Sequence, residues 1–507
     1  MRQDNRQTTY ERDAFQRINR ADYSDGSWEA FSYDKGGLLC GATNANSRIV
    51  FQRDDLECVI SEQQLLSEGT SEDGIQIESE YNLFGGRIWL VSSLGAEQTA
   101  GYNGIGLLEQ LQHDREGSKR RESNIRYDEA GRGIERFASG GLSIQSQYDT
   151  YGSMSGRFVY KGKKQRGYRI FSWGINDKLI TLKSHLLSSP VIFDYDKVAN
   201  LNYSSCGVYE RLFKAPDIIG NIYQGKERKD RVYDRGGRLL KDKEHYYRYD
   251  GEGNLILKST RNVLEPPVMP QPKDWLDKLF TRTTPNDKDL QAHYGWQQGD
   301  TAYEWYGNGM LKSVRTPEGA TIRFEYDALG RRTLKETHDR CHRYAWDGNV
   351  LLHEWSYDRR EKPRMEKEEL GRIRYDRQEL HTNLITWVYD GGSYTPVAKL
   401  TEDDSYTIVQ DYLGTSIQAL GSKGEIIWDC ILDIYGDVLE LRDERNFIPF
   451  RFQGMYFDEE PELCYVQNRY YSCDTGTFNS QDPIGLKGGM QLYAYVHDVN
   501  SCVDTMG

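Results

Sequence analysis

One short phrase recurs along the chain and constrains its fold more than any other feature. The phrase is an aromatic residue, Asp or Asn, a short gap, a glycine, and then Arg or Asn with an apolar residue. Clear copies begin at Tyr33, Tyr127, Tyr233, Tyr249, Tyr306 and Tyr326, and degenerate copies begin at Tyr81, Tyr148, Tyr195, Trp346 and Tyr389. Several neighbouring copies start about 20 residues apart. One copy would be ordinary turn chemistry, but about eleven with matched flanks indicate a repeat architecture.

Each copy of the phrase predicts a β-hairpin. The aromatic residue ends one strand, the Asp carboxylate accepts a backbone N–H in the turn, and the glycine supplies the positive φ that the turn requires. Flanking segments such as residues 321–326 alternate apolar and polar side chains, as strands do. Repeated hairpins give an antiparallel ribbon, which must coil to protect its edges. We therefore predict an all-β fold: a hairpin ribbon coiled into a hollow shell.

Composition is consistent with a thin, one-sided buried layer. Hydrophobic residues are 37% of the chain and its mean hydropathy is -0.77, which is polar for one compact core. Yet the chain has 36 Tyr, 10 Trp and 16 Phe, too many aromatic residues for a disordered protein. Tyrosine suits a sheet with one wet face, because its ring packs while its hydroxyl reaches water.

Charge and cysteine content exclude several classes of function. The net charge of -13 argues against nucleic-acid binding and suits a shell around a basic cargo. No apolar run is long enough to span a membrane, and no apolar signal segment opens the sequence. The 8 Cys are scattered without a CxxC pair, which predicts free thiols in a reducing cytosol. The 9 His form no ligand pattern, so we expect no metal and no cofactor.

Two stretches interrupt the repeat. Residues 265–290 combine a proline-rich run with a possible short amphipathic helix in DWLDKLF, and residues 358–377 are densely charged. Both are interpreted as surface or lumenal insertions, with contact to a partner or cargo as the alternative.

The repeated phrase is the YD repeat, and the sequence resembles the bacterial Rhs family over nearly its whole length. Residues 326–332 (YDALGRR), 342–348 (HRYAWDG) and 411–415 (DYLGT) are similar to the late repeats of that family. Residues 8–15 look like the middle of a repeat, so we expect the shell to be incomplete alone. A second shell chain, a second copy of this chain or upstream repeats would then cover the open edge.

The final segment carries the most specific resemblance. From Phe450 onward it is similar to the Rhs core signature, which divides the chain into a shell, residues 1–449, and a core segment, residues 450–507. In the family this segment plugs one end of the shell and acts as an intramolecular aspartyl protease. The resemblance implies catalytic carboxylates at Asp482 and Asp504, a supporting cation at Arg469, and a cleavage junction at Met506 and Gly507.

These residue types suit peptide hydrolysis. Two carboxylates held close can share one proton, so that one acts as acid while the other activates water. Arg469 could hold one carboxylate ionised or stabilise the negative charge that forms on the substrate. Asp-Pro-x-Gly is also a good turn, and an Arg–Asp pair is often only structural. Thr505 stands where the family has proline, and residues 471–474 and 460–463 also depart from the signature, which puts the backbone near the junction in doubt.

The resemblance implies a toxin-encapsulating shell that releases its cargo by one self-cleavage. The toxin would lie beyond Gly507. The shell would reside in the bacterial cytoplasm before export as a secreted effector, with type VI secretion, a secretion adaptor and bacterial competition as the expected context. Two alternatives stay open: a scaffold fragment without a toxin, and an extracellular YD-repeat module for adhesion or carbohydrate binding.

Overall fold

The molecule is built almost entirely from antiparallel strands. The structure, a computed structural model of the chain, describes residues 7–66, 74–115, 120–207, 211–267, 287–367 and 373–507. The first sheet, here called the outer wall, has 19 strands, each paired with the next along the chain. They are β1 (Thr8–Arg12), β2 (Ile18–Tyr23), β3 (Trp28–Tyr33), β4 (Leu39–Asn44), β5 (Ser47–Arg53), β6 (Val59–Leu66), β7 (Ile75–Tyr81), β8 (Arg87–Ser92), β9 (Ala96–Tyr102), β10 (Leu108–Arg115), β11 (Arg121–Tyr127), β12 (Gly133–Ala138), β13 (Leu142–Tyr148), β14 (Met154–Lys161), β15 (Lys164–Trp173), β16 (Leu179–Ser184), β17 (Val191–Tyr195), β18 (Leu201–Cys206) and β19 (Leu212–Phe213).

The second sheet has 16 strands in the same meander order. They are β22 (Val232–Tyr233), β23 (Leu239–Lys241), β24 (Tyr246–Tyr249), β25 (Leu255–Ser259), β26 (Thr301–Trp305), β27 (Leu311–Arg315), β28 (Thr321–Tyr326), β29 (Arg332–Glu336), β30 (Arg340–Asp347), β31 (Val350–Asp358), β34 (Ile385–Tyr389), β35 (Pro396–Leu400), β36 (Ser405–Gln410), β37 (Ser416–Leu420), β38 (Ile426–Leu432) and β39 (Val438–Arg442). A third sheet of four short strands follows: β40 (Tyr456–Asp458), β41 (Leu463–Val466), β42 (Arg469–Ser472) and β43 (Thr477–Phe478).

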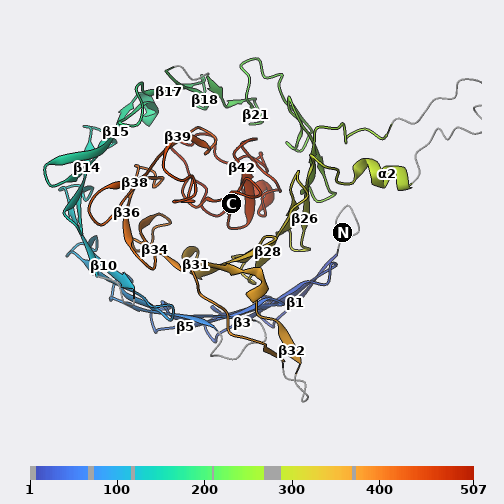
Figure 1. Cartoon of the computed structure of the whole chain (residues 1–507), viewed down its shortest axis with the longest axis horizontal. Coiled ribbons are helices and arrows are strands. Elements are labelled where there is room, and N and C mark those ends of the chain that lie inside the picture. The colour runs from blue at the N-terminus through green and yellow to red at the C-terminus, as the bar shows by residue number, and fades with distance from the viewer. Residues whose placement is uncertain (1–6, 67–73, 116–119, 208–210, 268–286, 368–372) are drawn as a thin grey trace, which may run out of the picture.

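The remaining elements are small. β20 (Ala215–Pro216) pairs with β21 (Ile222–Tyr223), and β32 (Met365–Lys367) pairs with β33 (Ile373–Tyr375). Helix α2 spans Asp287–Tyr294, and single 3-10 turns occupy η1 (Ile175–Asp177), η2 (Arg359–Glu361) and η3 (Gly485–Lys487). Both α2 and the β32–β33 hairpin project outward from the ring (Figure 1). The helix that the sequence suggests in DWLDKLF lies outside the described residues.

The repeat phrase forms the turn that its residues predict, and Asp128 shows how. Its Oδ1 accepts the backbone N–H groups of Ala130 at 3.0 Å and of Arg132 at 2.9 Å. Gly131 has φ +77°, a conformation that favours glycine. The Arg132 guanidinium folds back on Asp128 Oδ2 at 2.7 Å, so the arginine closes the turn instead of merely opening the next strand.

The aromatic residue of many phrases ties its hairpin to another hairpin. Tyr127 donates its hydroxyl to the carbonyl of Leu108 at 2.5 Å, and Tyr326 donates to Leu311 at 2.8 Å. At both tyrosines the strand register shifts by a bulge. Bulges increase the bend and twist of a strand, so a bulge repeated in successive hairpins curves the ribbon.

The ribbon coils into concentric layers. The outer wall forms most of the ring, and the second sheet continues the ring and then passes inside it (Figure 1). Leu142, Ile144 and Val159 of the wall pack against Val409 and Ile417 of the second sheet. The prediction of an all-β hairpin ribbon coiled into a shell is confirmed, and the second sheet and residues 450–507 occupy the middle of the ring.

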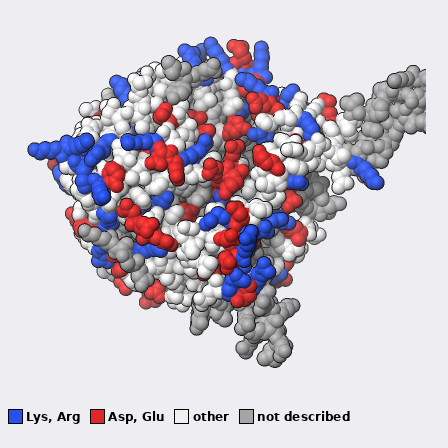
Figure 2. All heavy atoms as spheres, viewed as in Figure 1, with Lys and Arg blue, Asp and Glu red and all other residues white. Residues whose placement is uncertain are grey.

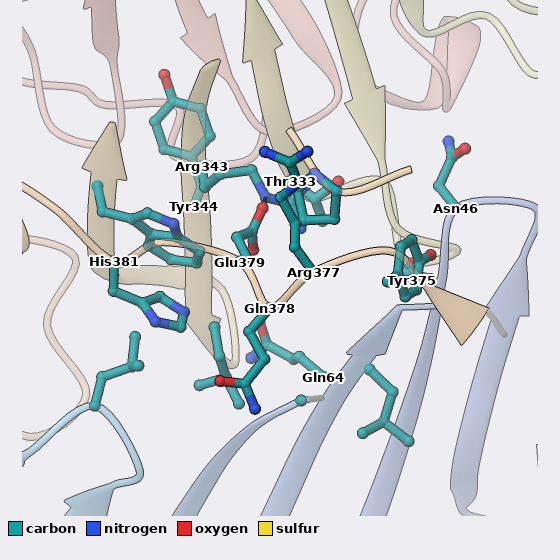
Figure 3. Close-up of a pocket in the computed structure, with 17 residues that line it drawn as sticks. Asn46, Gln64, Thr333, Arg343, Tyr344, Tyr375, Arg377, Gln378, Glu379 and His381 are labelled. Atoms are coloured by element: carbon teal, nitrogen blue, oxygen red, sulfur yellow. Dashed lines mark ion pairs between the residues drawn. The ribbon is translucent and has the colours of Figure 1, made fainter. Parts of the chain in front are cut away.

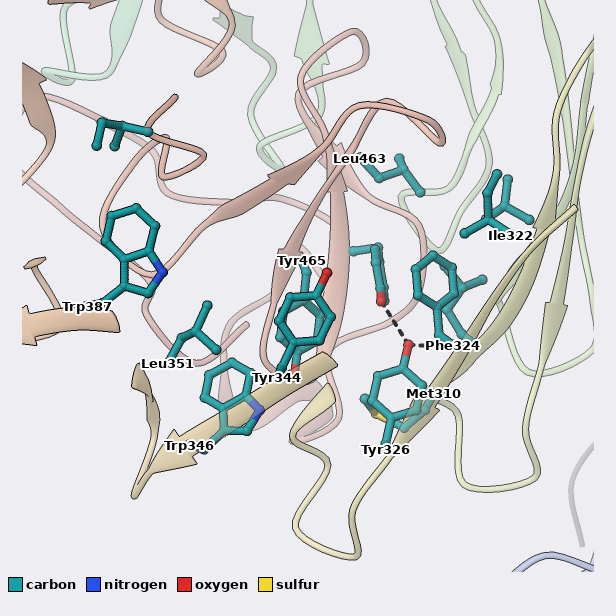
Figure 4. Packing of buried hydrophobic residues seen from close by; sticks show 14 of the residues in the cluster. Met310, Ile322, Phe324, Tyr326, Tyr344, Trp346, Leu351, Trp387, Leu463 and Tyr465 are labelled. Atoms are coloured by element: carbon teal, nitrogen blue, oxygen red, sulfur yellow. Dashed lines mark hydrogen bonds between the residues drawn. The ribbon is translucent and has the colours of Figure 1, made fainter. Parts of the chain in front are cut away.

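The main core lies between the second sheet and the C-terminal segment, residues 450–507. Phe324, Tyr326 and Trp387 of the second sheet join Leu463 and Tyr465 in one buried cluster (Figure 4). Among these aromatic side chains, Tyr326 and Tyr470 share a hydroxyl–hydroxyl hydrogen bond of 2.9 Å. The C-terminal segment is therefore a central part of the fold and its position is fixed by packing.

Candidate functional site

The C-terminal segment makes hydrogen bonds to two of the ribbon's turns. Turns that follow alternate strands of a meander fall on the same end of the ribbon. Tyr493 donates its hydroxyl to the carbonyl of Gly253, in such a turn, at 2.7 Å. Gln491 donates to the carbonyl of Ile219, in another, at 2.5 Å. The segment thus spans from turn to turn across this end.

Within this segment the structure brings the three predicted catalytic residues together. Arg469 begins β42, Asp482 follows β43, and Asp504 lies near the end of the segment. The Arg469 Nη2 atom is 3.3 Å from Asp504 Oδ2 and 3.7 Å from Asp482 Oδ2. The two carboxylate oxygens therefore face one guanidinium. Because both distances start from the same nitrogen, 3.3 Å plus 3.7 Å sets an upper limit of 7.0 Å on the distance between the two oxygens.

Arg469 is held rigidly beneath the two carboxylates. Its side chain is 3% exposed, its Nη1 donates to the carbonyl of Leu492 at 3.1 Å, and its guanidinium stacks 3.6 Å from the centre of the Phe478 ring. Burial lowers the pKa of Arg469, and the charges of Asp482 and Asp504 oppose that shift. A buried cation of this kind fixes the position of both acids.

The two carboxylates use their atoms in parallel ways. Asp482 accepts the Ile484 N–H through Oδ1 at 2.8 Å and turns Oδ2 toward Arg469. Asp504 accepts the N–H groups of Met506 at 3.2 Å and Gly507 at 3.0 Å through Oδ1, and it also turns Oδ2 toward Arg469. One acid therefore holds the backbone of the predicted junction directly.

The junction residues fit closely against the β41–β42 turn. Asn468 donates its side-chain amide to the carbonyl of Met506 at 2.8 Å. Gly507 has φ +74°, and a Cβ atom there would collide with the carbonyl oxygen of Val466. Thr505 lies directly against Gly454, so this threonine is accommodated where the family signature has proline.

Sequence reasoning missed the residues that support this arrangement. Phe478 stacks on Arg469, Asn468 holds Met506, and Tyr495 accepts the backbone N–H of Asp504 at 3.2 Å. Phe478 and Tyr495 both occupy specified positions of the signature that the sequence resembles, so a closer comparison of that signature could have identified them. Asn468 falls at a variable position of the signature, so the sequence gives no signal for its contact with Met506.

The cysteines and the candidate metal ligands form no further site among the described residues. All 8 cysteines are unpaired, including Cys464 and Cys473, whose Sγ atoms are 3.7 Å apart. Within the described residues, no three or more His, Cys, Asp or Glu side chains are grouped as a metal site would require. No helix in that part of the chain is long and apolar enough to cross a membrane.

A cavity of about 230 Å³ lies apart from the carboxylate pair, between the outer wall and residues that follow β33 (Figure 3). Arg343 and Glu379 form an ion pair of 2.8 Å on its wall, and the Trp355 and His381 rings lie 5.1 Å apart there. The charged stretch 358–377 therefore leads into a segment that packs against the wall.

Comparison with known proteins identifies the family. The teneurin YD-shell family matches residues 143–488, more than half of the chain. The chain is 26% identical over 372 residues to probable deoxyribonuclease RhsB of Dickeya dadantii, covering 71% of this chain and 20% of that protein. It is 24% identical over 511 residues to double-stranded DNA deaminase toxin A of Burkholderia cenocepacia, covering 94% of this chain and 30% of that protein.

The fold has solved counterparts as well. The Tc holotoxin pore of Photorhabdus luminescens superimposes with a TM-score of 0.63 and 15% identity over 98% of this chain and 27% of that one. At that identity the similarity defines the fold alone. The chain therefore belongs to the YD-shell family, with the Rhs-type shells as relatives. It spans less than a third of the length of RhsB and of the deaminase toxin.

Proposed function

We propose that the chain is the encapsulating shell of an Rhs-type toxin carrier and frees a C-terminal toxin by cutting itself at Gly507. The observation that carries the cleavage is the contact of Arg469 with both Asp482 and Asp504. The relatives named as a deoxyribonuclease and a deaminase toxin support a toxin as the cargo. The bacterial cytoplasm before export, delivery as a secreted effector and a secretion adaptor belong to the same proposal.

The reaction would be peptide hydrolysis within one chain. One carboxylate takes a proton from water as the water oxygen bonds to the carbonyl carbon of Gly507. The other carboxyl gives its proton to the amide nitrogen, which leaves as the C–N bond breaks. Arg469 would stabilise negative charge on the carbonyl oxygen. Holding catalyst and substrate on one chain can replace about 7–11 kcal/mol of a bimolecular barrier, so a slow acid pair would suffice for one turnover.

The test uses the chain extended beyond Gly507 by a short Gly/Ser-rich peptide, followed by intact-mass spectrometry. The parent should lose the extension without added protease. Asp482→Asn and Asp504→Asn keep the shape but remove a proton carrier, so each should stay intact. Arg469→Ala should slow the cut, and Arg469→Lys, which keeps the charge, should be less affected.

Asp474→Asn is the matched control, since Asp474 belongs to the same segment, is 63% exposed and pairs with Lys258. It should cut at the parental rate. If Asp482→Asn also cuts at that rate, the protease assignment fails and Asp482 is a turn residue.

A further inference from the structure

A second cavity lies beside the predicted junction, between the outer wall and two turns of the second sheet. It has a volume of about 490 Å³. From the wall it is lined by Tyr81, Arg87, Tyr102 and two glycines, and from the second sheet by residues of the turns at 347–350 and 389–394. We call it the junction cavity.

The end of the chain reaches the mouth of this cavity. The Met506 sulfur lies 3.8 Å from Asn349 Nδ2 and 3.9 Å from the Tyr394 hydroxyl, and both residues line the cavity. Asn349 also accepts a hydrogen bond of 3.2 Å from Gln467, in the turn against which Gly507 lies. The junction and the cavity thus share a wall.

The lining can hydrogen bond to a peptide backbone. Asp390 pairs with Arg136 through Oδ2, but its Oδ1 is buried and has no hydrogen-bond partner among the described residues. Four glycines line the cavity, and glycine leaves backbone groups accessible to a neighbouring chain. Asp347 pairs with Arg87 at 2.7 Å and Asp390 pairs with Arg136, so the carboxylates of the lining carry no large excess of charge.

The size of the cavity also suits a peptide. Ligand sites in proteins are commonly about 300–1,000 Å³. An extended chain rises about 3.3 Å per residue, so roughly three residues would fit such a space.

We propose that the junction cavity binds the polypeptide that continues from Gly507, as the subsite on the far side of the bond to be cut. This inference rests on the proposed function. The cavity would hold the leaving segment extended while Asp504 and Asn468 hold the near side, so the bond would be fixed from both directions.

Photo-crosslinking tests the path directly. A photoreactive amino acid is placed at the third residue after Gly507 in the extended Asp482→Asn chain, and crosslinked peptides are mapped by mass spectrometry. Crosslinks to the turn at residues 389–394 or to Tyr81 and Tyr102 are expected. The same group at position 506 is the positive control, since Met506 already touches Tyr394.

Two variants sharpen the result. Tyr394→Ala should reduce the crosslink yield about fivefold, as one lost hydrogen bond would. Gln378→Ala, in the other cavity (Figure 3), should leave it unchanged. Crosslinks to the exposed loop at residues 483–490, or none while position 506 still reacts, would overturn the inference.

Failure here is distinguishable from failure of the proposed function. A parent that cuts itself while the crosslinks map elsewhere refutes the cavity alone. Crosslinks in the cavity with an extended parent that stays intact refute the cleavage alone.

Discussion

The outer wall and the second sheet use the same turn in opposite surroundings. In the wall the turn tips point into solvent: the Phe84 side chain is 94% exposed and Ile105 is 78% exposed. In the second sheet the turn between β38 and β39 is covered: Ile434 is 1% exposed and Tyr435 is 2% exposed. The repeat therefore encodes the local turn, while the layer in which a turn lies decides how much stability its side chains contribute.

Charged side chains also differ between the surface and the interior of the molecule. One face of the molecule carries interspersed acidic and basic side chains without a single dominant sign (Figure 2). In the interior, Arg332 and Asp458 are 0% exposed and form an ion pair, with Lys335 3.2 Å from the same carboxylate. Buried charges of this kind require partners, because an unpaired charge in the core is strongly destabilising.

The largest expected effect separates two arginines at one repeat position. Arg331 is 1% exposed and pairs with Asp327 and Glu62, whereas Arg132 is 37% exposed and pairs with Asp128. Arg331→Ala leaves buried carboxylates unpaired and should cost about 3–5 kcal/mol. Arg132→Ala should cost roughly 0.2–1 kcal/mol. Urea unfolding of both variants measures the difference, and equal costs would refute the layer argument.

A smaller effect should appear in the pH dependence of the contact between the layers. His353 is fully buried and bridges Ser92 of the wall at 2.8 Å and Thr386 at 2.9 Å. Burial, together with the charges of Arg115 and His381, lowers the pKa of His353 to about 3. The unfolded chain binds this proton near pH 6.5, so folding stability should fall as pH drops from about 6.5 toward 3.

At pH 4 this loss would amount to about 3 kcal/mol from His353 alone. His353→Gln keeps hydrogen-bonding capacity without the titration, so its stability should depend less on pH over that range. Unfolding midpoints measured at pH 7 and pH 4 give the comparison. An unchanged pH slope in the variant would show that other groups dominate; His113, whose pKa burial lowers to about 4, is the next candidate.

The smallest effect is expected at the exposed turn tips. Phe84→Ser and Ile105→Ser remove side chains that water already surrounds, so each should change stability by less than about 0.5 kcal/mol. Ile434→Ser is the buried counterpart and should cost several times more. A large loss from Phe84→Ser in thermal unfolding would mean that the turn tips of the wall are covered in solution.

The local fold could be predicted from the sequence because each residue of the repeated phrase has its own local physical role. Asp128 closes its own turn, Gly131 supplies the positive φ, and Tyr127 reaches a neighbouring hairpin. The position of the second sheet inside the wall could not be predicted. It depends on contacts such as Arg169 with Asp429, 2.7 Å apart in space but 260 residues apart in sequence.

In the candidate site, too, some features could be predicted from the sequence and others could not. The resemblance to the Rhs core signature assigned Asp482, Asp504 and Arg469 to one catalytic reaction. The structure brings these three side chains together, while their catalytic role stays a prediction. The stacking of Phe478 on Arg469 and the contact of Asp504 with Tyr495 depend on the folded C-terminal segment. No periodicity or spacing could have indicated them.

The tyrosine bonds between hairpins also bear on the order in which the chain folds. Tyr127 needs the carbonyl of Leu108, and Tyr148 needs that of Gly133, so each of these two wall hairpins completes its bonds on one made earlier. Contacts between neighbours in sequence form quickly, since little loop entropy is lost. A ribosome delivers the chain in the same direction, which suits growth of the wall by addition of one hairpin at a time. If the chain folds in that order, Asp482 and Asp504 come together around Arg469 last, after the wall that surrounds them has formed.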